Sequence, residues 1–229
     1  MSYPPNIPLI LHQFWCNYEA EDVPPIDVMA VLSRTKTLFR DFEYHLWNRS
    51  AINVLIERKL PRYSQIYERV NIPAMKSDLS RLIALYIYGG VYLDATITPL
   101  RGESIGRLKA LIDGSALVVA ESRDDPNVIL NSFISVEPNN VHISSVLKSC
   151  FRSVSQSMEA QDETIDVWKL TGKQLSNYIA GNESGIQSLN RLKFCTASKV
   201  FTRISCEYKE DDYRNWDQIQ SGKFYPIYD

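Results

Sequence analysis

The sequence predicts an α/β fold in which helices cover both faces of one sheet. Three observations favour it: short apolar runs alternate with stretches of helical periodicity, 45% of the 229 residues are apolar, and no repeat or low-complexity linker divides the chain. Alternating strands and helices of this kind pack as a sheet between helical layers. A chain of this length suits one domain, so we expect a single domain over residues 1–229.

The first quarter of the chain contains short elements. Leu9–Trp15 is an apolar run and predicts a buried strand, whereas Val28–Leu38 places its apolar residues near one helical face. Phe42–Trp47 alternates between apolar and polar residues, which is typical of a second strand. Ile52–Arg58 suits a helix that ends before Pro61.

The segment from Pro73 to Asp94 has the clearest pattern. Pro73 suits the first turn of a helix, and the apolar residues that follow recur at helical spacing. The pair Gly89-Gly90 predicts the end of this helix, because glycine adopts the left-handed cap at little cost. Val91–Leu93 then forms a short predicted strand, and Asp94 stands at its end.

The second half of the chain continues the alternation. We expect strands at Ala116–Ala120 and Val128–Val136, and helices at Val141–Val154 and from about Asp162 to Ala180, with a break near Thr171-Gly172. Short strands and turns are expected from about residue 195 onward. In such sheets ligands bind beyond the carboxyl ends of the strands, where Trp15 and Asp94 both lie.

Charge and cysteine usage argue against several classes of protein. The net charge of −2 gives no basic surplus for nucleic acid. The four cysteines, at positions 16, 150, 195 and 206, form no CxxC pair, which argues against a structural zinc site and fits free thiols in a reducing compartment. The first residues lack a signal-peptide pattern, and no segment approaches the roughly 20 apolar residues of a membrane-spanning helix. We therefore expect a cytoplasmic protein.

Two charged side chains near the start of the Pro73 helix are candidate site residues. Asp78 and Arg81 are three residues apart, so they share one helical face, and alone they could form an ordinary surface ion pair. The tight turn at Gly89-Gly90, however, packs the helix back along the next strand. We therefore expect Asp78, Arg81 and Asp94 to converge on one site. An acid and an arginine that lie together can bind vicinal hydroxyls, as sugar recognition requires.

The motif formed by SDLSR (residues 77–81) and GGVYLDAT (residues 89–96) resembles the sugar-binding region of the DXD-type glycosyltransferases. That group includes yeast initiating mannosyltransferases, glucosyltransferase domains of clostridial toxins and bacterial capsular polysaccharide synthesis proteins. The opening run IPLILHQFW (residues 7–15) and the segment YHLW (residues 44–47) resemble further family segments. Asn131–Ile134 and Thr171-Gly172 resemble later, weaker ones.

The resemblance implies a GT-A fold with a mixed, mostly parallel sheet, and a nucleotide-sugar donor with a glycan or lipid-linked acceptor. It implies that Asp78 and Arg81 contact the donor sugar and that Tyr92 supports the sugar or the phosphate. Asp94 is the implied catalytic residue and would bind the ribose and the metal. Trp15 would stack on the nucleotide base. The implied substrate-binding residues are Trp15, Asp78, Arg81, Gly90, Tyr92, Asp94 and Asn131. For Trp15 the alternative is core packing. His12 is expected to be a structural hydrogen-bonding residue.

One position departs from the family pattern. Thr96 stands where the second aspartate of the DXD motif would bind the divalent ion, and threonine offers only a neutral oxygen. The expected metal residues are therefore Asp94 and Thr96, with Mn²⁺ or Mg²⁺ as a weakly held cofactor. We expect Thr96 to project to the same side as Asp94 in extended backbone.

The resemblance also favours retention of the anomeric configuration. An enzyme of this kind is expected to work at the inner face of a membrane without spanning it. A catalytically decayed nucleotide-sugar or glycan-binding module is the alternative, and Thr96 is its main support. A third alternative, a dinucleotide oxidoreductase, is disfavoured because the sequence contains no GxGxxG fingerprint. Weaker candidates are Asn215–Asp217 near the diphosphate, and Glu121 with Asp124 and Asp125 facing the acceptor; ordinary surface turns explain these equally well.

Overall fold

A six-stranded sheet forms the centre of the described part of the protein. The structure is a computed structural model that describes residues 7–17, 22–122, 125, 128–160, 165–182, 192–196 and 200–206. In their order across the sheet the strands are β2 (Glu43–Trp47), β1 (Ile10–Phe14), β3 (Gly90–Leu93), β6 (Ile129–Val136), β5 (Leu117–Glu121) and β7 (Leu192–Thr196). Strand β6 runs antiparallel to β3 and β5, and the other neighbours are parallel. The predicted mixed, mostly parallel sheet is confirmed.

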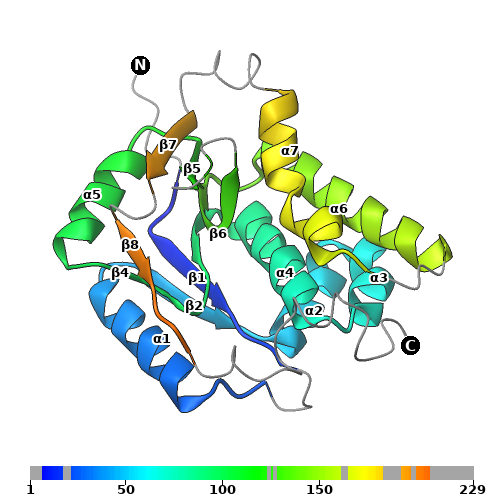
Figure 1. The fold of residues 1–229 in the computed structure, drawn as a ribbon, viewed down its shortest axis with the longest axis horizontal. Helices are drawn as coiled ribbons and strands as arrows, with labels where there is room; N and C mark the ends of the chain where they lie inside the picture. Colours follow the sequence, from blue (N-terminus) through cyan, green and yellow to red (C-terminus); the bar gives the residue numbers. More distant parts are fainter. Residues whose placement is uncertain are drawn as a thin grey trace.

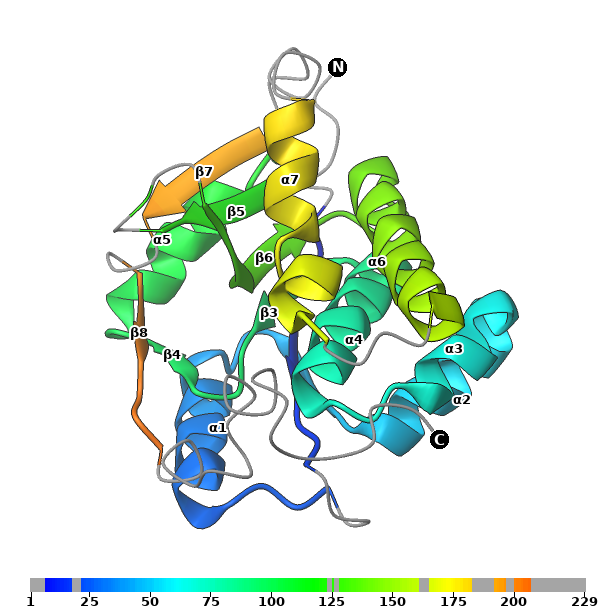
Figure 2. The same cartoon turned by 45° about the vertical axis from the view of Figure 1, so that its right-hand side comes forward.

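Helices cover both faces of this sheet (Figures 1 and 2). The helical elements are α1 (Ile26–Leu38), α2 (Arg49–Lys59), the 3-10 helix η1 (Pro61–Tyr63), α3 (Ser64–Arg69), α4 (Pro73–Tyr88), α5 (Glu103–Ile112), α6 (Val141–Ala160), the π-helical segment η2 (Trp168–Gly172) and α7 (Gln174–Gly181). One core contains side chains from α2, α3, α4, α6 and α7, and a second contains side chains from α5. The sheet lies between them.

Alternate residues of the strands supply the two cores. In β3 the ring of Tyr92 belongs to the core on the α4 side, whereas Val91 and Leu93 belong to the core on the α5 side. This is the two-residue period of an extended strand that is buried on both faces. It brings the Tyr92 ring toward α4.

A separate two-stranded ribbon lies next to Asp94. It consists of β4 (Ile97–Pro99) and β8 (Phe201–Arg203), which run antiparallel and pair Ile97 with Arg203. A tight turn joins β3 to β4, with the amide of Ile97 donating to the carbonyl of Asp94 at 2.9 Å. The ribbon therefore carries residue 203 close to the end of β3.

Most predicted elements are found within a few residues of their expected bounds, but η1, α3, β4 and α5 were not predicted. The predicted break near Thr171-Gly172 is the end of η2, and residues 161–164 lie outside the described part. The four cysteines, all described, are buried thiols rather than disulfides, as predicted. Among the described helices, none is long and apolar enough to cross a membrane.

Candidate functional site

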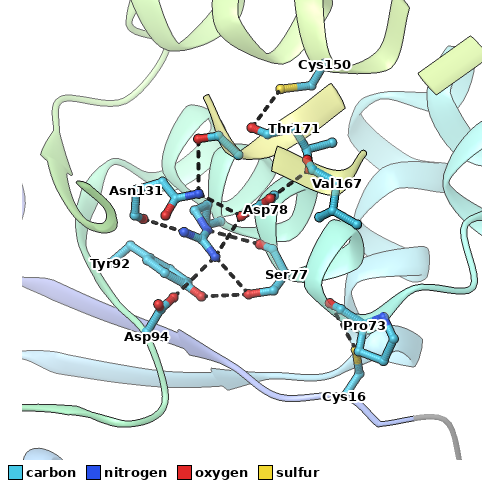
Figure 3. A network of polar contacts seen from close by, with 12 residues as sticks. Cys16, Pro73, Ser77, Asp78, Tyr92, Asp94, Asn131, Cys150, Val167 and Thr171 are labelled. Carbon is cyan, nitrogen blue, oxygen red and sulfur yellow. Dashed lines mark hydrogen bonds and ion pairs between the residues drawn. The ribbon is translucent and has the colours of Figure 1, made fainter. Parts of the chain in front are cut away.

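The turn at Gly89-Gly90 folds α4 back against β3, so that the start of the helix faces the end of the strand (Figure 3). Arg81 Nη2 lies 3.0 Å from Asp78 Oδ1 and 3.2 Å from Asp94 Oδ1. The hydroxyls of Ser77 and Tyr92 lie 3.2 Å apart across the same junction. The predicted convergence of Asp78, Arg81 and Asp94 is confirmed.

Arg81 is at the centre of this cluster and is only 5% exposed, so it is no surface ion pair. Besides the two carboxylates, it donates from Nη2 to Ser77 Oγ at 3.0 Å, from Nε to the Ser77 carbonyl at 3.3 Å, and from Nη1 to the Asn131 carbonyl. Burial opposes its charge, but Tyr92, Asp94 and Asp78 outweigh burial and raise the pKa of Arg81. It therefore stays charged and ties α4, β3 and β6 together.

Asp78 is also buried and fully engaged by protein groups. Its Oδ1 accepts from Asn131 Nδ2 at 3.0 Å, and its Oδ2 accepts from Thr171 Oγ1 at 2.7 Å. Burial raises the pKa of Asp78, while Arg81 and Thr171 act in the opposite direction. Thr171, from η2, belongs to the site, although in the sequence it stood out only as part of a weaker family segment. These contacts make Asp78 a fixed partner of Arg81.

Asp94 is the most accessible member of the cluster. Its side chain is 24% exposed, against 9% for Asp78 and 5% for Arg81. Its backbone is fixed on both sides, because the Asp94 amide donates to the Ser132 carbonyl at 3.1 Å and Gln13 Nε2 donates to the Asp94 carbonyl at 3.2 Å. Asp94 therefore presents a carboxylate to solvent from a rigid position at the carboxyl end of β3.

Tyr92 supports the cluster from within the core. It is 1% exposed, and the Arg81 guanidinium carbon lies 4.8 Å from the centre of its ring. Burial raises the pKa of the Tyr92 hydroxyl, so the phenol is neutral and contacts Ser77. A cation over an aromatic ring is stabilised by the negative face of that ring. Tyr92 thus positions Arg81.

Gly90 does not lie with the other predicted site residues. It begins β3, four residues before Asp94, which at about 3.3 Å per residue places it roughly 13 Å away. Its φ is +95°, and a Cβ there would lie 2.6 Å from the carbonyl oxygen of Ile10. Close approach of β1, rather than a substrate, explains why this position is glycine.

Trp15 and His12, from the opening strand, are both buried. Trp15 is 8% exposed and packs with Val28 and Ala95, as the core-packing alternative for this residue predicts. Stacking of Trp15 on a nucleotide base stays a prediction. His12 accepts from Trp47 Nε1 at 3.0 Å on Nδ1, so its Nε2 donates to the Gly89 carbonyl at 2.8 Å. Burial lowers the pKa of His12 to about 4, so it is neutral. His12 is a structural residue, as expected.

Thr96 is not placed as expected. Residues 94–97 form a turn rather than extended backbone, so the expectation that Thr96 projects to the same side as Asp94 is wrong in its premise. Thr96 is buried, and its carbonyl accepts from the Ile204 amide at 2.9 Å. The turn therefore separates Thr96 from the strand geometry on which its predicted role depended.

The described residues do not fit a resident divalent cation. Asp94 Oδ1 faces Arg81 at 3.2 Å and Oδ2 faces Arg203 at 3.7 Å, so a metal at Asp94 would meet two guanidinium groups. Within the part of the chain that is described, no group of three histidine, cysteine or acidic residues could hold a metal. Such ions prefer several carboxylate or carbonyl oxygens.

The weaker sequence candidates stay apart from this cluster or outside the described residues. Asn215–Asp217 and Asp124 belong to segments that the structure does not describe. Glu121 ends β5, which is separated from β3 by β6 in the sheet, and Asp125 is exposed in the loop that follows β5. A role for Glu121 and Asp125 toward an acceptor stays a prediction.

Comparison with known proteins gives a consistent result. Residues 25–112 match the glycosyltransferase sugar-binding region containing the DXD motif. An uncharacterized glycosyltransferase of Acanthamoeba polyphaga mimivirus is 23% identical over 204 residues, which cover 88% of this chain and 78% of that protein. Inositol phosphoceramide mannosyltransferase 3 of Schizosaccharomyces pombe is 32% identical over 91 residues, 40% of this chain and 24% of that protein.

Among solved structures, the glycosyltransferase PaToxG has a similar fold. The TM-score is 0.56 at 18% identity, over 82% of this chain and 74% of that one. Residues 25–112 therefore match the sugar-binding region of DXD glycosyltransferases, which confirms the predicted resemblance and the glycosyltransferase class. The structural similarity confirms the predicted GT-A fold. The chain spans about a quarter of the length of the S. pombe relative. The matched region contains Asp78, Arg81 and Asp94, whereas Trp15 and Asn131 lie outside it.

Proposed function

We propose that this chain transfers a sugar from a nucleoside-diphosphate sugar to a hydroxyl group of a glycan or lipid-linked acceptor. One observation carries the proposal: the buried pair of Asp78 and Arg81 holds the accessible carboxylate of Asp94 at the carboxyl end of β3. In α/β sheets this edge is where ligands bind. A carboxylate fixed there can accept hydrogen bonds from ribose or sugar hydroxyls.

In this proposal the three charged residues have different roles. Asp94 contacts the donor, since it is the most exposed of the three. Asp78 and Arg81 position Asp94, because their polar atoms are already occupied by protein groups. A carboxylate that is fixed before the donor arrives has no reorganisation to undergo as charge develops during the reaction. Asp78 and Arg81, which the resemblance placed in contact with the donor sugar, are therefore proposed as positioning residues instead.

Retention of the anomeric configuration is part of the same proposal. The nucleoside diphosphate leaves the anomeric carbon through an oxocarbenium-like transition state. An inverting enzyme needs a general base on the opposite face that can take the acceptor's proton. Asp78 is buried, and both oxygens of Asp94 face guanidinium groups, so neither carboxylate of the described cluster suits that task. The arrangement therefore favours retention.

The acceptor proposal is supported by the name of a relative. The S. pombe protein is named an inositol phosphoceramide mannosyltransferase, and a phosphoceramide is a lipid. A lipid-linked acceptor would bring this chain to a membrane surface, and we propose the cytoplasmic face. Polysaccharide or capsule synthesis is the other setting compatible with a hydroxyl acceptor. The two settings differ in whether the acceptor partitions into vesicles.

A ligand screen tests the proposed function. Thermal unfolding is measured with uridine and guanosine diphosphate sugars, and the matching nucleoside monophosphates serve as controls. A ligand at a hundred times its Kd stabilises the protein by about 2.7 kcal/mol, which such a screen detects. The selected donor is then incubated alone, and slow release of nucleoside diphosphate is expected. Binding without release would indicate a sugar-nucleotide binding module, and binding of none of these donors would contradict the proposal.

A further inference from the structure

Arg203 is held beside Asp94 by a strand that comes from the far end of the chain. It pairs with Ile97 in the β4–β8 ribbon. Backbone hydrogen bonds fix the ribbon at both ends, from the Ile204 amide to the Thr96 carbonyl at 2.9 Å and from the Leu100 amide to the Val200 carbonyl at 3.1 Å. Arg203 Nη2 therefore lies 3.7 Å from Asp94 Oδ2 on a fixed backbone.

The two arginines that flank Asp94 differ in what they can still bind. Arg81 is 5% exposed, and its guanidinium already contacts four residues. The Arg203 side chain is 54% exposed, and its contact with Asp94 involves one corner of the guanidinium. A guanidinium presents five N–H donors in a planar fork that matches phosphate oxygens. Arg203 can thus contact Asp94 and an anionic ligand at the same time.

The charges of the cluster favour an anion rather than a cation at its exposed edge. Asp78 and Asp94 are balanced by Arg81 and Arg203, and the position that would supply a second DXD carboxylate is the neutral Thr96. A divalent cation that approaches Asp94 from solvent meets the Arg203 guanidinium, which repels it. A diphosphate that approaches along the same path is attracted by that group.

We propose that Arg203 binds the diphosphate of the sugar donor and neutralises the negative charge that a divalent cation neutralises in other DXD enzymes. This rests on the proposed function. During transfer the bond between the anomeric carbon and the phosphate oxygen breaks, and the oxygen keeps the electron pair. The acceptor oxygen forms the new bond to the anomeric carbon and its proton passes to the departing phosphate, so that a glycoside and a nucleoside diphosphate result. Arg203 stabilises the negative charge on the phosphate as it leaves.

Calorimetric titration with uridine and guanosine diphosphates tests this role without any turnover. Wild type, Arg203→Gln, Arg203→Lys and Arg152→Gln are compared in excess EDTA; Arg152 is an exposed arginine on α6 and is the matched control. We expect wild type to bind in EDTA, and Arg203→Gln to bind at least about tenfold more weakly, as loss of a charged hydrogen bond implies. Arg203→Lys should fall between them, and Arg152→Gln should match wild type within twofold. Thermal unfolding of Arg203→Gln should be unchanged.

Two results would overturn the role of Arg203. One is wild-type binding that disappears in EDTA and returns with Mn²⁺, and the other is an Arg203→Gln variant that binds within twofold of wild type. In both cases donor hydrolysis by wild type would leave the proposed function standing. If neither diphosphate binds wild type with or without Mn²⁺, both proposals fail.

Discussion

Replacing Arg81 with alanine should destabilise the fold as well as impair the reaction. The change removes the guanidinium that lies 3.0 Å from Asp78 and 3.2 Å from Asp94, and it leaves the Asn131 carbonyl without its charged donor. Asp78 then remains as a buried carboxylate without a counter-charge. Removing one partner of a buried ion pair costs about 3–5 kcal/mol, which is a large fraction of the 5–15 kcal/mol that stabilises a typical domain.

Urea unfolding of Arg81→Ala and of the exposed control Arg152→Ala measures this loss. The control should change the free energy of unfolding by no more than about 0.5 kcal/mol. Lys76 on α4 is no suitable control, because it is buried and its Nζ donates to the Tyr67 carbonyl at 2.7 Å. A second substitution, Asp78→Asn, should restore part of the stability, because a neutral amide needs no counter-charge.

A free energy of unfolding for Arg81→Ala within about 1 kcal/mol of wild type would refute this reasoning. It would mean that water or a shifted side chain replaces the guanidinium at little cost. Failure of Asp78→Asn to restore any stability would contradict the narrower claim that the uncompensated carboxylate causes the loss.

Three further changes test other parts of the structure. Gly90→Ala should lower the free energy of unfolding by about 2 kcal/mol or more. The new Cβ would lie 2.6 Å from the Ile10 carbonyl oxygen, and alanine rarely adopts the positive φ of this position. An unchanged urea midpoint would contradict this. Thr96→Asp should lower the free energy of unfolding by more than about 3 kcal/mol, because it buries a carboxylate without a counter-charge. It should leave Mn²⁺ binding by calorimetry unchanged, whereas tighter Mn²⁺ binding would show that residue 96 reaches the site. Between pH 6.5 and about 4 His12 is protonated in the unfolded chain but not in the folded protein. As pH falls through this range, the free energy of unfolding of wild type should therefore fall by about 3 kcal/mol more than that of His12→Gln. Parallel pH profiles of unfolding would argue against a neutral buried His12.

The part of the site that could be predicted from sequence is the part built from neighbouring elements. Asp78, Arg81 and Asp94 lie within one helix–turn–strand unit, and a tight turn at glycine leaves the helix little choice but to pack along the strand. Helical spacing placed the two charges on one face, and the strand end placed the third. Local rules of this kind act over a few residues and can be read without knowing the rest of the fold.

The contacts that could not be predicted come from distant segments. Thr171 reaches Asp78 across 93 positions in the sequence, and Arg203 reaches Asp94 because β8 pairs with β4. Pairings of that separation depend on the packing of the whole sheet, which periodicity does not reveal. The expected geometry of Thr96 failed for a local reason, since a turn at residues 94–97 replaced the extended backbone that the alternation rule assumes.

Donor turnover by Asp94→Asn tests most directly whether Asp94 is the centre of the donor site. Release of nucleoside diphosphate is measured for wild type and variant, with the donor selected by the thermal screen and with unfolding midpoints recorded in parallel. The side chain is 24% exposed and asparagine keeps its shape, so the variant should fold with a midpoint near that of wild type. We predict that its turnover falls by about a hundredfold or more, as when a preorganised group is removed from an active site. A folded Asp94→Asn variant that releases nucleoside diphosphate at the wild-type rate would contradict the assignment of the donor site to Asp94.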